Sequence, residues 1–95
     1  MKIISYTTHL ELRLELRTIP VDYPRTIAND PDEIYWDTAE NRRIAIKRLL
    51  YQGTMRPMMI AYDETEQEII IITIHPISEG QLSSRVARGR WQKDG

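Results

Sequence analysis

The chain has 95 residues, no cysteine and a formal net charge of −1 at pH 7. This length fits a single domain, and the lack of cysteine excludes disulfides, thiolate zinc sites and cysteine nucleophiles. Residues 1–79 carry nine Lys/Arg against thirteen Asp/Glu, a net of −4, whereas residues 80–95 carry four against one, a net of +3. A basic segment on a nearly neutral chain indicates an anionic partner. Because the N-terminal apolar run is too short for a signal peptide and the longest apolar run has the length of a strand, we expect a cytoplasmic protein without membrane association.

The first third of the chain predicts a strand followed by two helices. Residues 2–6 are typical of a short strand. Residues 9–17 alternate polar and apolar with the period of a strand, but their Leu, Glu and Arg favour a helix. Thr8 and Glu11 match a capping box, so we predict a helix over 9–17. Pro20 ends that helix, and residues 21–28 predict a second, short one.

The remainder predicts strands over 33–37, 42–50, 57–62 and 68–75, joined by turns. The last run is the most apolar, which favours a central place in the sheet. Residues 78–92 predict a C-terminal helix or arm. The order β-α-α-β-β-β-β predicts an α+β domain over residues 1–78, with two N-terminal helices on a mostly antiparallel four- to five-stranded sheet. Residues 79–95 are predicted to form a basic C-terminal arm.

Several short patterns occur in the order found in one family. They are Thr8-His9-x3-Arg13-x3-Arg17-x-Ile19, Asn29-Asp30-Pro31, Ile44-Ala45-Ile46-Lys47-Arg48, Tyr62-Asp63-Glu64 and Ile72-Thr73-Ile74-His75-Pro76. Over roughly residues 3–76 the chain resembles the small bacterial and archaeal domains that sit beside the RelE/ParE- and BrnT-type toxin superfamily. The resemblance implies a compact α+β fold, cleavage of messenger RNA, often on the ribosome, without a metal or other cofactor, and pairing with a cognate antitoxin. Such toxins are usually clearly basic, and this chain is not.

Three kinds of residue are candidates for catalysis. His75 lies at the end of the most apolar strand and could act as acid or base. Arg85 and Arg88 could clamp a phosphate, and Tyr62 could donate a proton or stack on a base. The alternative for His75 is a half-buried polar residue that ends a strand before a proline turn.

Further residues are candidates for RNA binding. His9 and Arg13 lie one helical turn apart, whereas Lys47 and Arg48 fall on opposite faces of one strand, so that only one of them can face a site. Trp91 lies in the basic segment and either docks on the sheet or binds a partner. The predicted RNA-binding set is His9, Arg13, Lys47, Arg90 and Trp91. A metal site is not predicted, because His9 and His75 lack the local spacing of metal ligands.

Two hypotheses follow. The first is a toxin-like, RNA-directed protein, an mRNA endoribonuclease whose partners are RNA or the ribosome and an antitoxin. The second is a non-catalytic protein-binding module or homodimer whose C-terminal arm and Trp91 dock on a partner. Net charge favours the second hypothesis and the resemblance favours the first, which we take as the working hypothesis.

Overall fold

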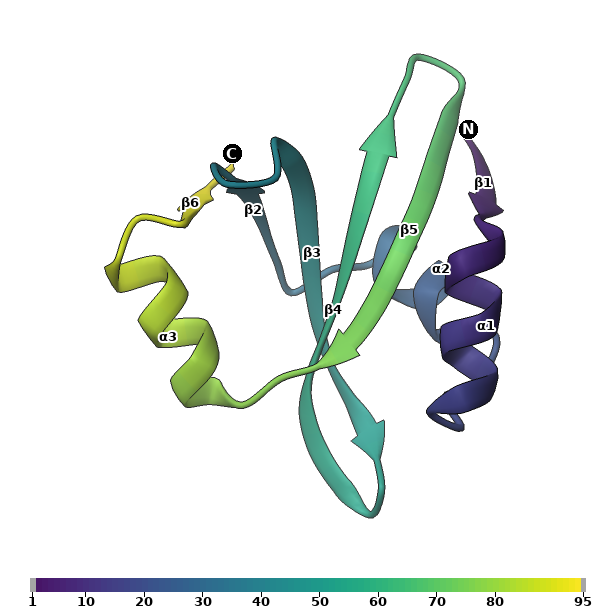
Figure 1. Ribbon diagram of the computed structural model, residues 1–95, viewed down its shortest axis with the longest axis horizontal. Coiled ribbons are helices and arrows are strands. Elements are labelled where there is room, and N and C mark those ends of the chain that lie inside the picture. Colours follow the sequence, from purple (N-terminus) through teal and green to yellow (C-terminus); the bar gives the residue numbers. More distant parts are fainter. Residues whose placement is uncertain (1, 95) are drawn as a thin grey trace.

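Three helices and six strands make up residues 2–94, the part of the chain that the computed structural model describes; Met1 and Gly95 lie outside it (Figure 1). In chain order the elements are β1 (Ile3–Tyr6), α1 (Thr8–Leu16), α2 (Tyr23–Asn29), β2 (Glu33–Asp37), β3 (Arg42–Tyr51), β4 (Thr54–Glu64), β5 (Glu68–Pro76), α3 (Glu79–Ala87) and β6 (Trp91–Lys93). The predicted α+β class is confirmed. None of the helices within residues 2–94 combines the length and apolar character needed to cross a membrane.

The six strands form one mixed sheet in the order β1-β5-β4-β3-β2-β6. The prediction of four to five strands was too low, because β6 adds an edge strand beside β2. At the other edge β1 pairs parallel to β5, and the remaining pairings are antiparallel, as predicted. The apolar strand β5 is internal but not central, since β4 and β3 occupy the middle of the sheet.

The long central hairpin of β3 and β4 is closed by a two-residue turn. Gln52 and Gly53 both have positive φ, at 52° and 77°, and Tyr51 pairs with Thr54. This is the geometry of a type I′ turn, which matches the twist of antiparallel strands and favours glycine. The hairpin therefore sets the register of the two strands that form the middle of the sheet.

The helix predicted at residues 9–17 is present as α1, despite the period-two pattern. Leu10 and Leu14 are buried, whereas Leu12 and Leu16 are exposed, because residues four apart share one face of a helix. The N-cap is Thr7 rather than the predicted Thr8. The Thr7 hydroxyl accepts a hydrogen bond from the Leu10 N–H at 3.1 Å.

Two apolar clusters lie on opposite faces of the sheet. Helices α1 and α2 cover one face, where Leu10 and Ile27 pack against Ile60. Helix α3 covers the other face, where Leu82 and Met59 share a second cluster. Successive strand residues point to opposite faces, so Met59 and Ile60 serve different clusters.

The segment predicted as a C-terminal helix or arm forms helix α3 and strand β6, and is part of the sheet and its covering layer. Helix α3 begins with a capping box between Ser78 and Gln81, and Gly89, with φ of 76°, follows its end. Strand β6 then pairs with β2, and Trp91 is only 2% exposed. The C-terminal segment therefore adds an edge strand to the sheet and a helix to one of its faces.

Candidate functional site

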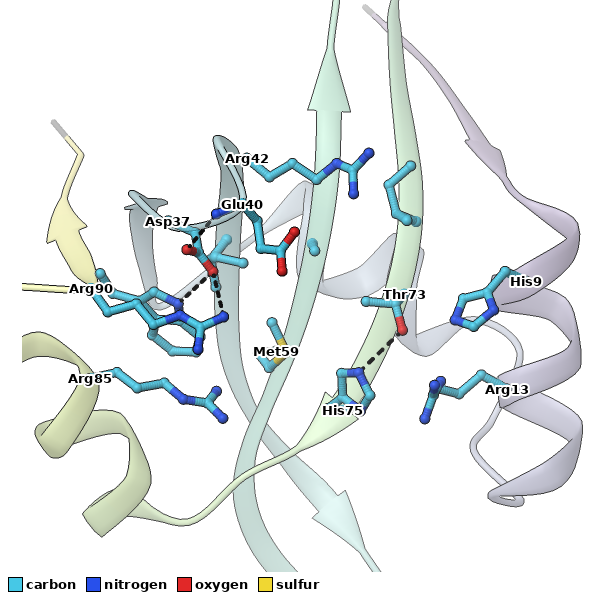
Figure 2. Close-up of a pocket in the computed structure, with 14 residues that line it drawn as sticks. His9, Arg13, Asp37, Glu40, Arg42, Met59, Thr73, His75, Arg85 and Arg90 are labelled. Atoms are coloured by element: carbon cyan, nitrogen blue, oxygen red, sulfur yellow. Dashed lines mark hydrogen bonds and ion pairs between the residues drawn. The ribbon is translucent and has the colours of Figure 1, made fainter.

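A groove of about 340 Å³ lies on the sheet face that carries α3 (Figure 2). Its floor is apolar and comes from β3, β4 and β5. Its rim comes from α1 on one side and from α3, β6 and the β2–β3 turn on the other. The floor residues are Ile44, Met59, Ala61 and Ile72. Ligand pockets commonly hold roughly 300–1,000 Å³, so the volume suits a ligand about the size of one nucleotide unit.

A bulge in β5 shapes the side of the groove next to α1. Ala61 pairs with Thr73 but Tyr62 pairs with Ile71, which leaves Ile72 as an extra residue. Bulges redirect side chains, and here Ile72 and Thr73 both line the groove. Thr73 and His75 then share a face, and the Thr73 hydroxyl lies 3.4 Å from Nε2 of His75.

His75 is the most electrostatically perturbed group in the groove. The pKa of His75 is lowered from 6.5 to about 4, first by burial and then by the neighbouring charges of Arg13, Arg17, Arg85 and His9. Its imidazole is therefore neutral at pH 7 and can accept a proton or a hydrogen bond.

Two arginines face the groove from opposite sides, Arg13 from α1 and Arg85 from α3 (Figure 2). Neither forms an ion pair within residues 2–94. Nε of Arg13 is also buried without a hydrogen-bond partner in that part of the chain. Because neither side chain is held by a carboxylate in that part of the chain, both are available to an anionic ligand in the groove.

Arg85 is supported by an aromatic ring that is itself anchored. Its guanidinium lies 4.8 Å from the centroid of the Trp91 ring, a cation–π distance. The Trp91 indole N–H donates to Oδ2 of Asp37 at 3.1 Å. The residues joined in this way come from α3, β6 and β2, so β6 pairing with β2 brings Arg85 to the groove.

Asp37 is charged although it is only 3% exposed. Its Oδ1 accepts from the N–H groups of Ala39 and Glu40 at 2.9 and 3.1 Å, and Nη2 of Arg90 lies 3.5 Å from Oδ2. Burial alone would raise the pKa of Asp37, but the hydrogen bonds from Glu40, Trp91 and Ala39 outweigh it and lower the pKa. Both carboxylate oxygens are therefore engaged within the protein.

Most of the residues predicted from the sequence meet at the groove. They are His9, Arg13, His75, Arg85, Arg90 and Trp91. Trp91 takes a different part from the one predicted. Because its ring is 2% exposed and packs in the second cluster, it supports Arg85 and offers little surface on which a base could stack.

Three predicted residues lie outside the groove. Tyr62 is buried in the cluster beneath α1 and α2, on the opposite face of the sheet. Lys47 shares that side and donates to the Asp30 carbonyl at 2.9 Å. Strand alternation puts both residues on the wrong face for the groove. Arg88 is the exposed C-cap of α3 and is not among the residues that line the groove.

Several groove residues were not predicted from the sequence. Thr73 could have been predicted, because it lies two residues before His75 and so shares its face of the strand. The sequence gives no indication of Asp37, Glu40 and Arg42, since only the folded β2–β3 turn brings them near β5 and α3. Arg42 is engaged by Asp63, whose Oδ1 lies 3.2 Å from its Nε.

Comparison of the chain with known protein families, curated proteins and solved structures finds no match. Among residues 2–94, there is no grouping of three or more His, Asp or Glu side chains that could hold a metal ion.

Proposed function

We propose that the protein is an RNA-directed endoribonuclease of the RelE-like kind, and that the groove is its active site. The observation that carries the proposal is the convergence of Arg13 and Arg85 on a neutral His75. A phosphodiester is an anion of the size that two facing guanidinium groups can clamp. A neutral imidazole beside it can accept a proton, and a bound phosphate anion, by offsetting the arginine charges, raises the pKa of His75 toward neutral pH.

The proposed reaction uses the 2′-OH of the substrate as its nucleophile. His75 takes the proton of this hydroxyl, and the 2′ oxygen attacks the adjacent phosphorus. The bond from phosphorus to the 5′ oxygen breaks, and that oxygen takes up a proton, which we assign to His9 on the rim. The products are a 2′,3′-cyclic phosphate and a 5′-hydroxyl. Arg13 and Arg85 stabilise the charge that builds on the phosphoryl oxygens.

The net charge of −1 does not oppose this assignment, because binding depends on the local field of the groove. Four arginines line it, against two carboxylates: Arg13, Arg42, Arg85 and Arg90 against Asp37 and Glu40. Most of the acidic residues instead lie elsewhere, and several are held in ion pairs, such as Asp30 with Lys47 and Glu79 with Arg48.

The second hypothesis, a protein-binding or homodimeric module, relied on Trp91 as an anchor for a partner. Its support is weakened because Trp91 is buried within its own chain. Action on the ribosome and pairing with an antitoxin remain predictions that rest on the resemblance.

The test is binding and cleavage of a single-stranded RNA at low and moderate salt. We expect wild-type protein to leave 2′,3′-cyclic phosphate ends, and His75→Ala to cut about 10²–10⁴-fold more slowly, as is typical when a general base is lost. The double variant Arg13→Ala/Arg85→Ala should lose binding. Arg25→Ala is the matched control, since Arg25 is exposed on α2. Absence of RNA binding by wild-type protein, or full cleavage by His75→Ala, would contradict the proposal.

A further inference from the structure

Glu40 is the one groove carboxylate that no protein group engages within residues 2–94. It lies in the turn between β2 and β3, is exposed, and lines the groove. Its backbone N–H is held by Oδ1 of Asp37 at 3.1 Å, which fixes the turn from which the side chain projects. In Figure 2 the carboxylate of Glu40 points over the groove, on the side opposite His9 and Arg13. A free carboxylate in a groove lined by several arginines favours a ligand that carries hydrogen-bond donors as well as negative charge.

The space between the two ends of the groove is suited to a flat, apolar ring. Ala61 and Ile72, which line the groove and are half-buried, give its floor accessible apolar surface. Unstacked RNA bases bind by placing a face against apolar or aromatic side chains while their edges are read by hydrogen bonds. A nucleotide with its phosphate between Arg13 and Arg85 would thus have its base over this floor.

We propose that Glu40 is a base-reading residue that selects guanine. This inference rests on the proposed function, since it assumes that RNA occupies the groove. A carboxylate presents two acceptors side by side. Guanine alone among the four RNA bases presents two adjacent donors, N1–H and the N2 amino group, on its Watson–Crick edge. In adenine, cytosine and uracil at least one acceptor lies next to the donor and would face the second oxygen of Glu40.

Asp37 cannot take this role, although it also lines the groove. Its Oδ1 accepts from two backbone N–H groups and its Oδ2 from the Trp91 indole. Glu40 is therefore the carboxylate available for a ligand, and its removal leaves the hydrogen bonds of the turn intact, because they use its backbone and not its side chain.

The experiment measures binding of short 2′-O-methyl RNAs, which cannot be cleaved, with a central G, A, C or U in an otherwise identical U-rich sequence. A good bidentate contact discriminates by about 1–3 kcal/mol, so we expect wild-type protein to prefer the G oligonucleotide by roughly tenfold or more. Glu40→Gln should weaken G binding and slightly strengthen binding of the other three, because a repulsive charge is lost. Glu66→Gln, on the exposed β4–β5 turn, is the matched control and should retain the preference.

Each other outcome has a distinct meaning. Salt-sensitive binding of all four RNAs with equal affinity would overturn the assignment of Glu40 and leave the proposed function standing. An equal gain for all four RNAs in Glu40→Gln would show that Glu40 only repels phosphate, which also overturns the assignment. Failure of wild-type protein to bind any of the RNAs would overturn both the proposed function and the base-reading inference.

Discussion

Replacement of Trp91 tests whether the C-terminal segment belongs to the folded domain. The ring is 2% exposed, packs at a centroid distance of 6.0 Å against Tyr35, and donates to Asp37. A buried Trp→Ala change typically costs about 3–5 kcal/mol. Against a total stability of about 5–15 kcal/mol for a domain of this kind, that is a large share. Trp91→Ala should therefore be strongly destabilised.

The expected order of effects separates the ring from its hydrogen bond. Trp91→Phe keeps an aromatic ring but removes the hydrogen bond to the buried carboxylate of Asp37, which is worth about 1.5–3 kcal/mol. The stability of this variant should therefore lie between that of Trp91→Ala and that of wild type. The matched control is Trp36→Ala, because Trp36 is 37% exposed and contacts Arg43 by a cation–π interaction at 5.9 Å. Such an exposed contact is worth about 0.5–1 kcal/mol.

The assay is urea unfolding followed by far-ultraviolet circular dichroism, which does not depend on the tryptophans removed. Urea m-values of small proteins are about 1–3 kcal/mol per molar, so a cost of about 3–5 kcal/mol lowers the midpoint by at least about 1 M. If Trp91→Ala lowers it no more than Trp36→Ala does, Trp91 is not docked, and the C-terminal segment is the free arm that the sequence alone suggested.

Three further predictions concern local features. The pKa of His75 is about 4 in the folded protein, below its unfolded value of 6.5, so between pH 4 and 6.5 the unfolded chain binds a proton that the folded chain does not. Wild type should lose stability relative to His75→Gln as pH falls from 6.5 to 4, by clearly less than the unscreened limit of about 1.4 kcal/mol per pH unit, because the side chain is only half-buried. An equal difference between the two urea midpoints at pH 7 and at pH 4.5 would contradict this. Arg85→Ala should reduce the slope of log affinity for RNA against log salt concentration by about 0.7, whereas Arg88→Ala should leave this slope unchanged. Equal slopes for the two variants would contradict binding of RNA in the groove. Thr7→Ala should lower the free energy of unfolding, measured by heat or urea, by about 1 kcal/mol, and Thr8→Ala should lower it clearly less. The reverse order would show that Thr8 is the helix cap.

The predicted elements depend on local chemistry, and that is why they were largely recovered. Helix α1 formed because Leu, Glu and Arg favour a helix and because Leu10 and Leu14 bury one face of it. Strands β2 to β5 are joined by turns such as Gln52-Gly53, whose backbone conformation depends on the residues of the turn itself. The cap at Thr7 was missed by one residue because two adjacent threonines offer the same side chain.

Sequence periodicity placed predicted residues together only where they share one helix or one strand. His9 and Arg13 lie one turn apart on α1, and they reach the groove together with His75. Tyr62 and Lys47 were misplaced because the face that a strand residue occupies depends on which side carries the helices. That choice involves α1 and α2 on one side and α3 on the other.

Local patterns in the sequence are enough to predict the α+β class, the positions of most elements and the basic character of the C-terminal segment. The docking of this segment on the sheet, which makes Arg85 face His75 across one groove, is evident only from the fold. The contacts responsible for it are distant in sequence. Trp91 and Asp37 lie 54 residues apart, and no local pattern reveals that their hydrogen bond and the pairing of β6 with β2 are more favourable than leaving the basic segment in solvent.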